Sequence, residues 1–181
     1  MSRYIAFLRA INVGGHTVKM DHLRGLFESS GLSSVETFIT SGNIVFDTKS
    51  GDAMVVEKRI EKLLREELGY EVVVFIRTSM ELAEIAKYKP FPQPAVEKAT
   101  ALNIAFLKDK LDEQSEKKLM GLRTHIDNFR VHEREVYWLC LKKQSESTFS
   151  NAVLEKTLNR QSTLRGINTI KKIAEKYFTK H

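Results

Sequence analysis

The first 76 residues alternate between two hydrophobic periods, and this alternation restricts the folds that the chain can adopt. Short runs with an apolar residue at every second position predict strands, and segments with apolar residues three and four apart predict helices. The predicted elements are a strand, a helix, two strands, a helix and a strand, at residues 4–8, 20–30, 35–39, 44–46, 52–68 and 72–76. This β-α-β-β-α-β order predicts a ferredoxin-like domain, whose strands lie in the order 4-1-3-2.

The predicted strand order brings two loops together. The first strand leads into the loop at residues 9–15, and the third strand starts from the turn at residues 41–43. Because the first and third strands are antiparallel neighbours in this topology, both loops should meet at one edge of the sheet. That edge lies beside the start of the first predicted helix.

The second half repeats the theme less regularly. All three prolines fall within residues 89–94, which predicts an extended connector. After it, a strand, a helix, two strands, a helix, a short strand and a final helix are predicted at residues 102–107, 112–122, 126–131, 136–141, 150–158, 162–164 and from 167 onward. We therefore expect an α+β protein with two tandem ferredoxin-like domains, at residues 1–88 and 89–181, the second ending in a basic C-terminal helix. Residues 8–12 and 164–168 also share Leu-Arg-x-Ile-Asn, which is either a trace of duplication or chance.

Composition narrows the class of protein. A content of 42% hydrophobic and 29% charged residues is typical of a globular chain and argues against disorder. The longest apolar run, residues 72–76, is too short to span a membrane. The amino terminus lacks the pattern of a signal peptide, and the single cysteine, Cys140, excludes an intrachain disulfide. These features predict a cytoplasmic protein with no membrane partner.

The net charge of +6 is concentrated near the C-terminus. Residues 1–88 hold 11 Lys and Arg against 12 Asp and Glu, whereas residues 142–181 hold 9 against 3. Lys171, Lys172 and Lys176 on the last helix could contact RNA, DNA or an acidic protein surface, or could form a solvated face. The oligomeric state is not predicted.

A small anionic ligand, bearing phosphate or carboxylate, is the preferred functional hypothesis. Glycines let the backbone approach an anion, a helix start offers N–H groups, and an arginine supplies a charged fork. Alternatively, the glycines only turn the chain and Asn12 binds its own loop. The site would lie at the loop edge or in a cleft between the domains, completed by the start of the last helix. The predicted ligand-binding residues are Arg9, Asn12, Gly14, Gly15, Ser41, Gly42, Asn43, Arg165 and Asn168.

Other chemistry is weakly indicated. The five histidines lack the spacing of a metal site, and no cofactor motif is present, so neither metal nor cofactor is predicted. His16 is the only histidine in the glycine-rich loop and could act as an acid or base there, or be solvated. Ser41 has no base beside it in sequence, and Cys140 fits a strand in the core. Whether the protein is an enzyme stays open.

The chain resembles a family of mainly bacterial proteins, the domain-of-unknown-function family 1697. Its members open with Leu-Arg-Gly-Ile-Asn-Val-Gly-Gly, matched at residues 8–15 with Ala10 in place of the first glycine. Lys19-Met20 and the Ser-Gly-Asn at residues 41–43 also match. Near the end, Arg165, Asn168 and Thr169 fit the family pattern, whereas Gly166 and Ile167 depart from it. The resemblance implies two ferredoxin-like domains and no particular reaction.

Overall fold

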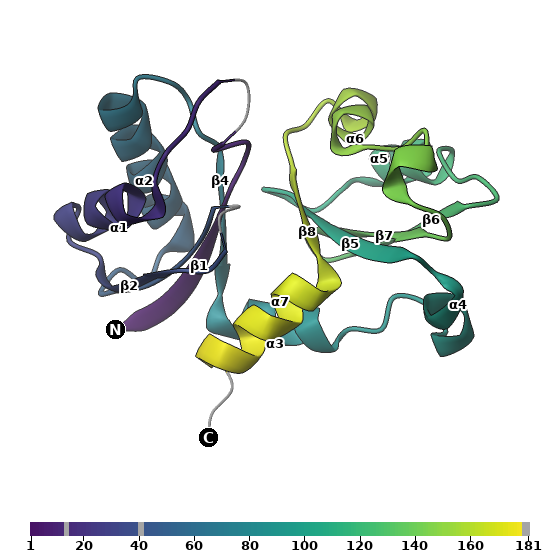
Figure 1. Cartoon of the computed structure of the whole chain (residues 1–181), viewed down its shortest axis with the longest axis horizontal. Helices are drawn as coiled ribbons and strands as arrows, with labels where there is room; N and C mark the ends of the chain where they lie inside the picture. Colours follow the sequence, from purple (N-terminus) through teal and green to yellow (C-terminus); the bar gives the residue numbers. More distant parts are fainter. Residues whose placement is uncertain (13–14, 40–41, 179–181) are drawn as a thin grey trace. The chain divides into compact units, whose positions relative to one another are not determined.

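The computed structural model describes residues 1–12, 15–39 and 42–178. The chain forms two compact units, Met1–Ala86 with Lys172–His181, and Lys87–Lys171. Each unit contains one four-stranded sheet with its own helices (Figure 1). The domain limits at residues 1–88 and 89–181 stay a prediction, because a compact unit is a cluster of contacts whereas a domain is a segment that folds by itself.

The first unit has the predicted ferredoxin-like order of elements. They are β1 (Ser2–Leu8), α1 (Met20–Ser29), β2 (Ser33–Thr37), β3 (Asn43–Thr48), α2 (Ala53–Leu68), β4 (Val74–Thr78) and α3 (Ser79–Lys87). The strands lie in the order β2-β3-β1-β4 with antiparallel neighbours, which confirms the predicted order. Helix α3 was not predicted from the sequence.

Every second side chain of β1 from Tyr4 to Leu8 points into the hydrophobic core of the first unit. Tyr4, Ala6 and Leu8 are buried in one cluster with apolar residues of α1 and α2. The ends of α2 follow local chemistry, because the Asp52 side chain accepts hydrogen bonds from the first-turn amides of Met54 and Val55. At the other end, Gly69 adopts a left-handed conformation with φ of 81°.

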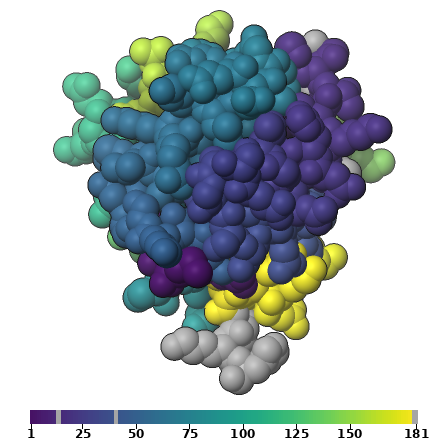
Figure 2. Space-filling model, turned by 90° about the vertical axis from the view of Figure 1, so that its left-hand side faces the viewer, coloured from purple at the N-terminus to yellow at the C-terminus, as the bar shows by residue number. Residues whose placement is uncertain are grey.

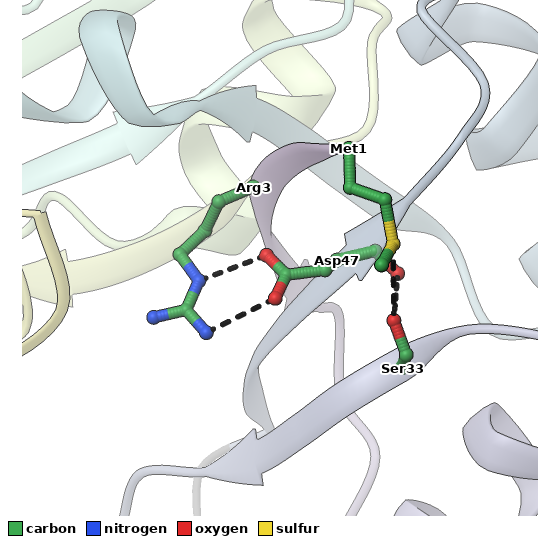
Figure 3. A network of polar contacts seen from close by, with 4 residues as sticks. All are labelled: Met1, Arg3, Ser33 and Asp47. Atoms are coloured by element: carbon green, nitrogen blue, oxygen red, sulfur yellow. Dashed lines mark hydrogen bonds and ion pairs between the residues drawn. The ribbon is translucent and has the colours of Figure 1, made fainter.

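An ion pair joins the two central strands, β1 and β3, at the end of the sheet where β1 begins. The Arg3 guanidinium donates to both carboxylate oxygens of Asp47 on β3, at 3.0 and 3.3 Å, and the Ser33 hydroxyl lies 3.5 Å from the sulfur of Met1 (Figure 3). Burial alone would raise the pKa of Asp47, but hydrogen bonds from Arg3 and Ser34 and the charge of Arg3 outweigh it and lower the pKa. The pair ties β1 to its central neighbour.

The end of the chain packs on the first unit. The rings of Phe38 and Tyr177 meet edge to face with centroids 6.2 Å apart, and the Lys176 ammonium lies 5.9 Å from the Phe38 ring. In Figure 2 the C-terminal segment is yellow and lies against the blue surface of the first unit. The described C-terminal residues therefore belong structurally with β2 and its hairpin.

The second unit repeats the first. Its elements are α4 (Gln93–Lys98), β5 (Ala101–Phe106), α5 (Glu113–Met120), β6 (Asp127–His132), β7 (Glu135–Cys140), a 3-10 turn (Gln144–Glu146), α6 (Asn151–Leu158), β8 (Thr163–Gly166) and most of α7 (Ile167–Ile173). The end of α7, from Lys172, and the π-helical turn after it (Ala174–Phe178) belong to the first unit. The strand order β6-β7-β5-β8 is again ferredoxin-like. The prediction of an extended connector at residues 89–94 was wrong in part, since Gln93 and Pro94 begin α4, where a first-turn proline is tolerated.

Strand pairing shows which segments of the two units correspond. Ile5 pairs with Arg77 on β4, and Ile104 pairs with Arg165 on β8. This aligns residues 5–8 with residues 104–107, and both read Ile-Ala-Phe-Leu. The Leu-Arg-x-Ile-Asn echo instead matches the end of the first strand of one unit with the last strand of the other, so it does not mark equivalent positions.

Candidate functional site

The end of β1 meets the β2–β3 hairpin, as the sequence predicts. The Leu8 amide donates to the Gly42 carbonyl at 2.9 Å, and Asn43 pairs with Phe7. Gly42 has φ of 79°, and a Cβ there would lie 3.0 Å from side-chain atoms of Leu8 and Ile11. A glycine is therefore required where the hairpin closes over β1. We call the edge formed by residues 8–12 and 42–43 the first-unit rim.

Side chains of the predicted site hold the first-unit rim in shape. The Asn12 side-chain oxygen accepts from the Val18 amide at 2.8 Å, which folds the loop back toward α1. The buried Asn43 side chain donates to the Phe38 carbonyl at 2.9 Å, and the Arg9 backbone amide donates to Val73 at 2.9 Å. The predicted Gly14 and Ser41 lie outside the described residues.

A hollow of about 580 Å³ opens beside the amino end of α1. We call it the α1 hollow; residues 15–19 and His22 line it together with Glu67, Leu68 and Tyr70 from the end of α2. Gly15, a predicted ligand-binding residue, is part of this lining and has φ of 85°. One aromatic pair stiffens the wall, because the rings of His16 and Tyr70 stack with centroids 3.9 Å apart. The hollow thus lies next to the loop that the sequence singled out.

The start of α1 is chemically open. Lys19 occupies the N-cap position, and its side chain makes no capping hydrogen bond to the first-turn amides. Those amides carry the positive end of the helix dipole, which favours anions. Lys19, His16 and His22 are exposed around the hollow and face one acidic lining residue, Glu67. This combination of groups suits a small anion.

Several residues of the hollow were missed by sequence reasoning. His22, Glu67 and Tyr70 were not named as candidates, and Lys19 appeared only as part of the family motif. Tyr70 follows the helix-ending Gly69, and His22 lies in the first turn of α1. Their approach depends on how the end of α2 packs beside α1, which no local pattern in the sequence reports.

The remaining predicted residues lie in the second unit. Arg165 on β8 is 8% exposed and donates to the Thr163 hydroxyl at 2.7 Å and to the Leu164 carbonyl at 2.8 Å. Burial lowers the pKa of Arg165 to about 10. Asn168 is exposed on α7. The structure therefore gives Arg165 partners on its own strand, and its predicted role toward a ligand stays a prediction.

The residues that the structure describes hold neither a metal-binding cluster nor a helix that could cross a membrane. Within them, no three His, Cys, Asp or Glu side chains gather closely enough to hold a metal ion. No helix in residues 1–12, 15–39 and 42–178 has the length and apolar character needed to cross a bilayer. Cys140 is buried, its thiol donates to the Lys142 carbonyl at 2.9 Å, and burial raises its pKa. A thiol held in this way is a poor nucleophile.

A solved structure of another protein shares this fold. The conserved bacterial protein SP0830 from Streptococcus pneumoniae has a similar structure, with a TM-score of 0.77 and 23% sequence identity, covering 96% of this chain and 97% of that one. No protein of curated function matches the chain. The model of the family described as proteins of unknown function (DUF1697) matches residues 1–137. The chain therefore belongs to the DUF1697 family.

Proposed function

We propose that this protein binds a small anionic ligand, bearing phosphate or carboxylate, in the α1 hollow. The observation that carries the proposal is a hollow beside the start of α1, where the N-cap residue Lys19 makes no capping hydrogen bond with its side chain and three basic side chains belong to the lining. Backbone amides at a helix start bind phosphate and carboxylate well, because donors and dipole point the same way. Lys19 supplies the charge, and His16 and His22 supply ring N–H donors.

The start of α5 in the second unit can be compared with the start of α1. At the equivalent start of α5, the Asp112 carboxylate accepts from the Ser115 amide at 2.7 Å. Hydrogen bonds from Ser115 lower the pKa of Asp112, and nearby Arg160 and Lys118 lower it further. A carboxylate of the chain itself therefore sits where the first unit leaves an open helix start. This supports an external anion in the first unit.

Phosphate titration of the whole chain tests the proposal. In 15N-labelled protein, inorganic phosphate should shift the amide signals of residues 15–22 and saturate. Lys19→Glu should weaken phosphate binding about tenfold, because it replaces an attractive charge with a repulsive one. Lys49→Glu makes the same charge change at an exposed position outside the hollow and should leave the affinity unchanged. Equal losses in both variants would show unspecific attraction and contradict the site.

A second candidate is a nucleic-acid contact at the C-terminal helix. It is favoured by the exposed Lys171, Lys172 and Lys176, the last of which lies beside the rings of Phe38 and Tyr177. Lysines that neutralise phosphates make binding fall steeply with salt. Affinity for a single-stranded oligonucleotide should then drop as salt rises and be lost in the triple Lys→Glu variant. A flat salt response would remove this candidate.

We also propose a cytoplasmic location. It is supported by the single cysteine, which is buried and unpaired, because disulfides are common in exported proteins and rare in the cytoplasm. Cell fractionation of a tagged chain would check it.

A further inference from the structure

A second hollow, of about 430 Å³, lies in the second unit and is separate from the α1 hollow. We call it the β6 groove. It is lined by Ala95 of α4, by residues 123–128, and by Leu139 of β7 and Leu141 just after that strand. The Leu141 amide donates to the Ile126 carbonyl at 2.8 Å, so two apolar lining residues are tied together. Its size falls within the range of about 300–1,000 Å³ that is usual for pockets that hold small ligands.

The groove exposes apolar surface that the fold does not use. Leu141 is 40% exposed, which makes it one of the exposed large apolar side chains of the chain, and Ile126 is partly buried. Leu139, which also lines the groove, is 3% exposed. An aliphatic side chain of a partner could bury itself against these residues and gain the free energy of leaving water.

One exposed arginine lines the groove, and two exposed lysines lie close in sequence to lining residues. Arg123, which lines the groove, is exposed and donates through Nε to the Met120 carbonyl at 3.2 Å. Lys142 directly follows Leu141, and Lys98 lies one helical turn beyond Ala95; both are exposed. Among the residues that the structure describes, no ion pair involves any of these three cations. Their charge is therefore available to a partner.

The one carboxylate of the lining is committed elsewhere. Asp127 is 1% exposed, and its oxygens accept from Trp138 Nε1 at 2.9 Å, from the Ser147 hydroxyl at 2.8 and 2.9 Å and from the Thr124 hydroxyl at 2.9 Å. These hydrogen bonds hold the Asp127 carboxylate in its buried position. Of the described lining residues with a full charge, Arg123 is therefore the exposed one, and its charge is positive.

We propose that the β6 groove docks a short acidic segment of a partner protein, with an aliphatic side chain seated on Ile126 and Leu141. Arg123 and the neighbouring lysines attract the acidic side chains of the segment, and Ile126 and Leu141 contact its aliphatic side chain. Among the described lining residues His125 carries the one aromatic ring, so the groove lacks the series of rings on which proteins stack successive bases of a single strand. A peptide therefore fits the groove better than an oligonucleotide does.

The test uses the full chain and a fluorescein-labelled peptide of two Asp-Glu-Leu-Glu repeats. In 15N-labelled protein the peptide should shift the amide signals of residues 123–128 and 139–142. By fluorescence anisotropy, the Arg123→Glu/Lys142→Glu variant should bind about tenfold more weakly. Leu141→Ser should weaken binding about fivefold, because it removes apolar contact. Lys156→Glu, an exposed change on α6 outside the groove, should have no effect.

Each alternative outcome has a clear meaning. Equal binding of a peptide with Ser in place of Leu would show that charge alone acts, and would overturn the apolar seat. Stronger shifts of the same signals with single-stranded oligothymidylate would overturn the peptide in favour of nucleic acid. Absence of shifts in the groove, or equal weakening by Lys156→Glu, would overturn the site. If Leu141→Ser fails to fold, the exposed charge variant still decides.

Discussion

The connection from β1 to α1 spans residues 9–19, whereas the equivalent connection from β5 to α5 spans only residues 107–112. Both begin alike, because the Leu8 amide donates to Gly42 at 2.9 Å and the Leu107 amide donates to Arg134 at 3.0 Å. They then diverge. The second unit closes its rim with the Lys110–Glu133 ion pair at 2.7 Å and with the Asp112 cap, whereas the first unit opens the α1 hollow.

This difference shows which part of the molecule makes a candidate site. The strands, their order and even the Ile-Ala-Phe-Leu core segment are shared, so the ferredoxin-like framework alone does not create a hollow. A short connection ending in an aspartate satisfies its own helix start, whereas a long one with glycines and no acid at the cap leaves amides for another partner.

The largest effect is expected from Gly42→Ala, at the point where the hairpin of the first unit closes. The left-handed φ of 79° penalises any side chain, and the new Cβ would lie 3.0 Å from atoms of Leu8 and Ile11. Strain and overpacking together should lower the free energy of unfolding by about 3 kcal/mol. Urea unfolding followed by circular dichroism measures the change.

Gly15→Ala is the matched control for Gly42→Ala. Gly15 also has a positive φ, of 85°, but a Cβ there meets nothing within 4 Å. Only the conformational cost should remain, about 1 kcal/mol. Equal losses in the two variants would show that the contact of Gly42 with β1 adds nothing to the stability of the first unit.

Asp112→Ala opens the closed helix start in the second unit. The variant should unfold more readily, because the Ser115 amide loses its acceptor. Since the pKa of Asp112 is lowered in the folded protein, its contribution is present above the unfolded pKa and is lost as pH falls through the folded pKa. Unfolding midpoints of both proteins should therefore converge in acid. Phosphate affinity should not rise, and a new phosphate site at residues 113–116 would show that an open helix start alone is sufficient.

Arg3→Ala tests whether the start of β1, at the end of the first sheet far from the first-unit rim, is independent of that rim. Losing the two hydrogen bonds to Asp47 should cost about 0.5 kcal/mol at neutral pH, as for other cross-strand ion pairs. Because the pKa of Asp47 is lowered, this stabilisation should vanish as pH falls through the folded pKa. Urea unfolding at neutral and acidic pH measures both. Altered phosphate shifts in residues 15–22 would contradict the independence.

The sequence predicts most of the fold because each element carries a local signal. Asp52 and Gly69 mark the ends of α2, and the alternation along β1 predicts which face is buried. Helix α3 was missed because it follows β4 directly, with no cap or turn residues between strand and helix. Helix α4 was missed because prolines were interpreted only as breakers, although Pro94 lies in its first turn.

Less of the candidate site could be predicted, because it depends on packing between distant segments. Residues 9–15 pointed to the loop from which Gly15 enters the lining of the α1 hollow, but Asn12 and Asn43 bond to the backbone of their own loops. Glu67 and Tyr70 enter the lining only through the position of α2 beside α1. The exposed Arg123 and Leu141 of the β6 groove lie in stretches whose sequence looks like an ordinary loop and strand end.

The smallest expected effect is a gain in stability from Ala10→Gly, within the long connection of the first unit. Ala10 has φ of 54°, a left-handed conformation that costs a side chain free energy. It stands where the resembling family pattern has glycine, and its side chain is exposed, so little packing is lost on removal. Relief of strain exceeds the extra entropy of an unfolded glycine, and the free energy of unfolding should rise by about 0.5 kcal/mol. Urea unfolding measures it, with Ala152→Gly on α6 as a control that should destabilise, because φ is negative in a helix. A loss of stability in Ala10→Gly would show that the alanine makes the connection between β1 and α1 more rigid. The length of this connection would then be what distinguishes it from residues 107–112.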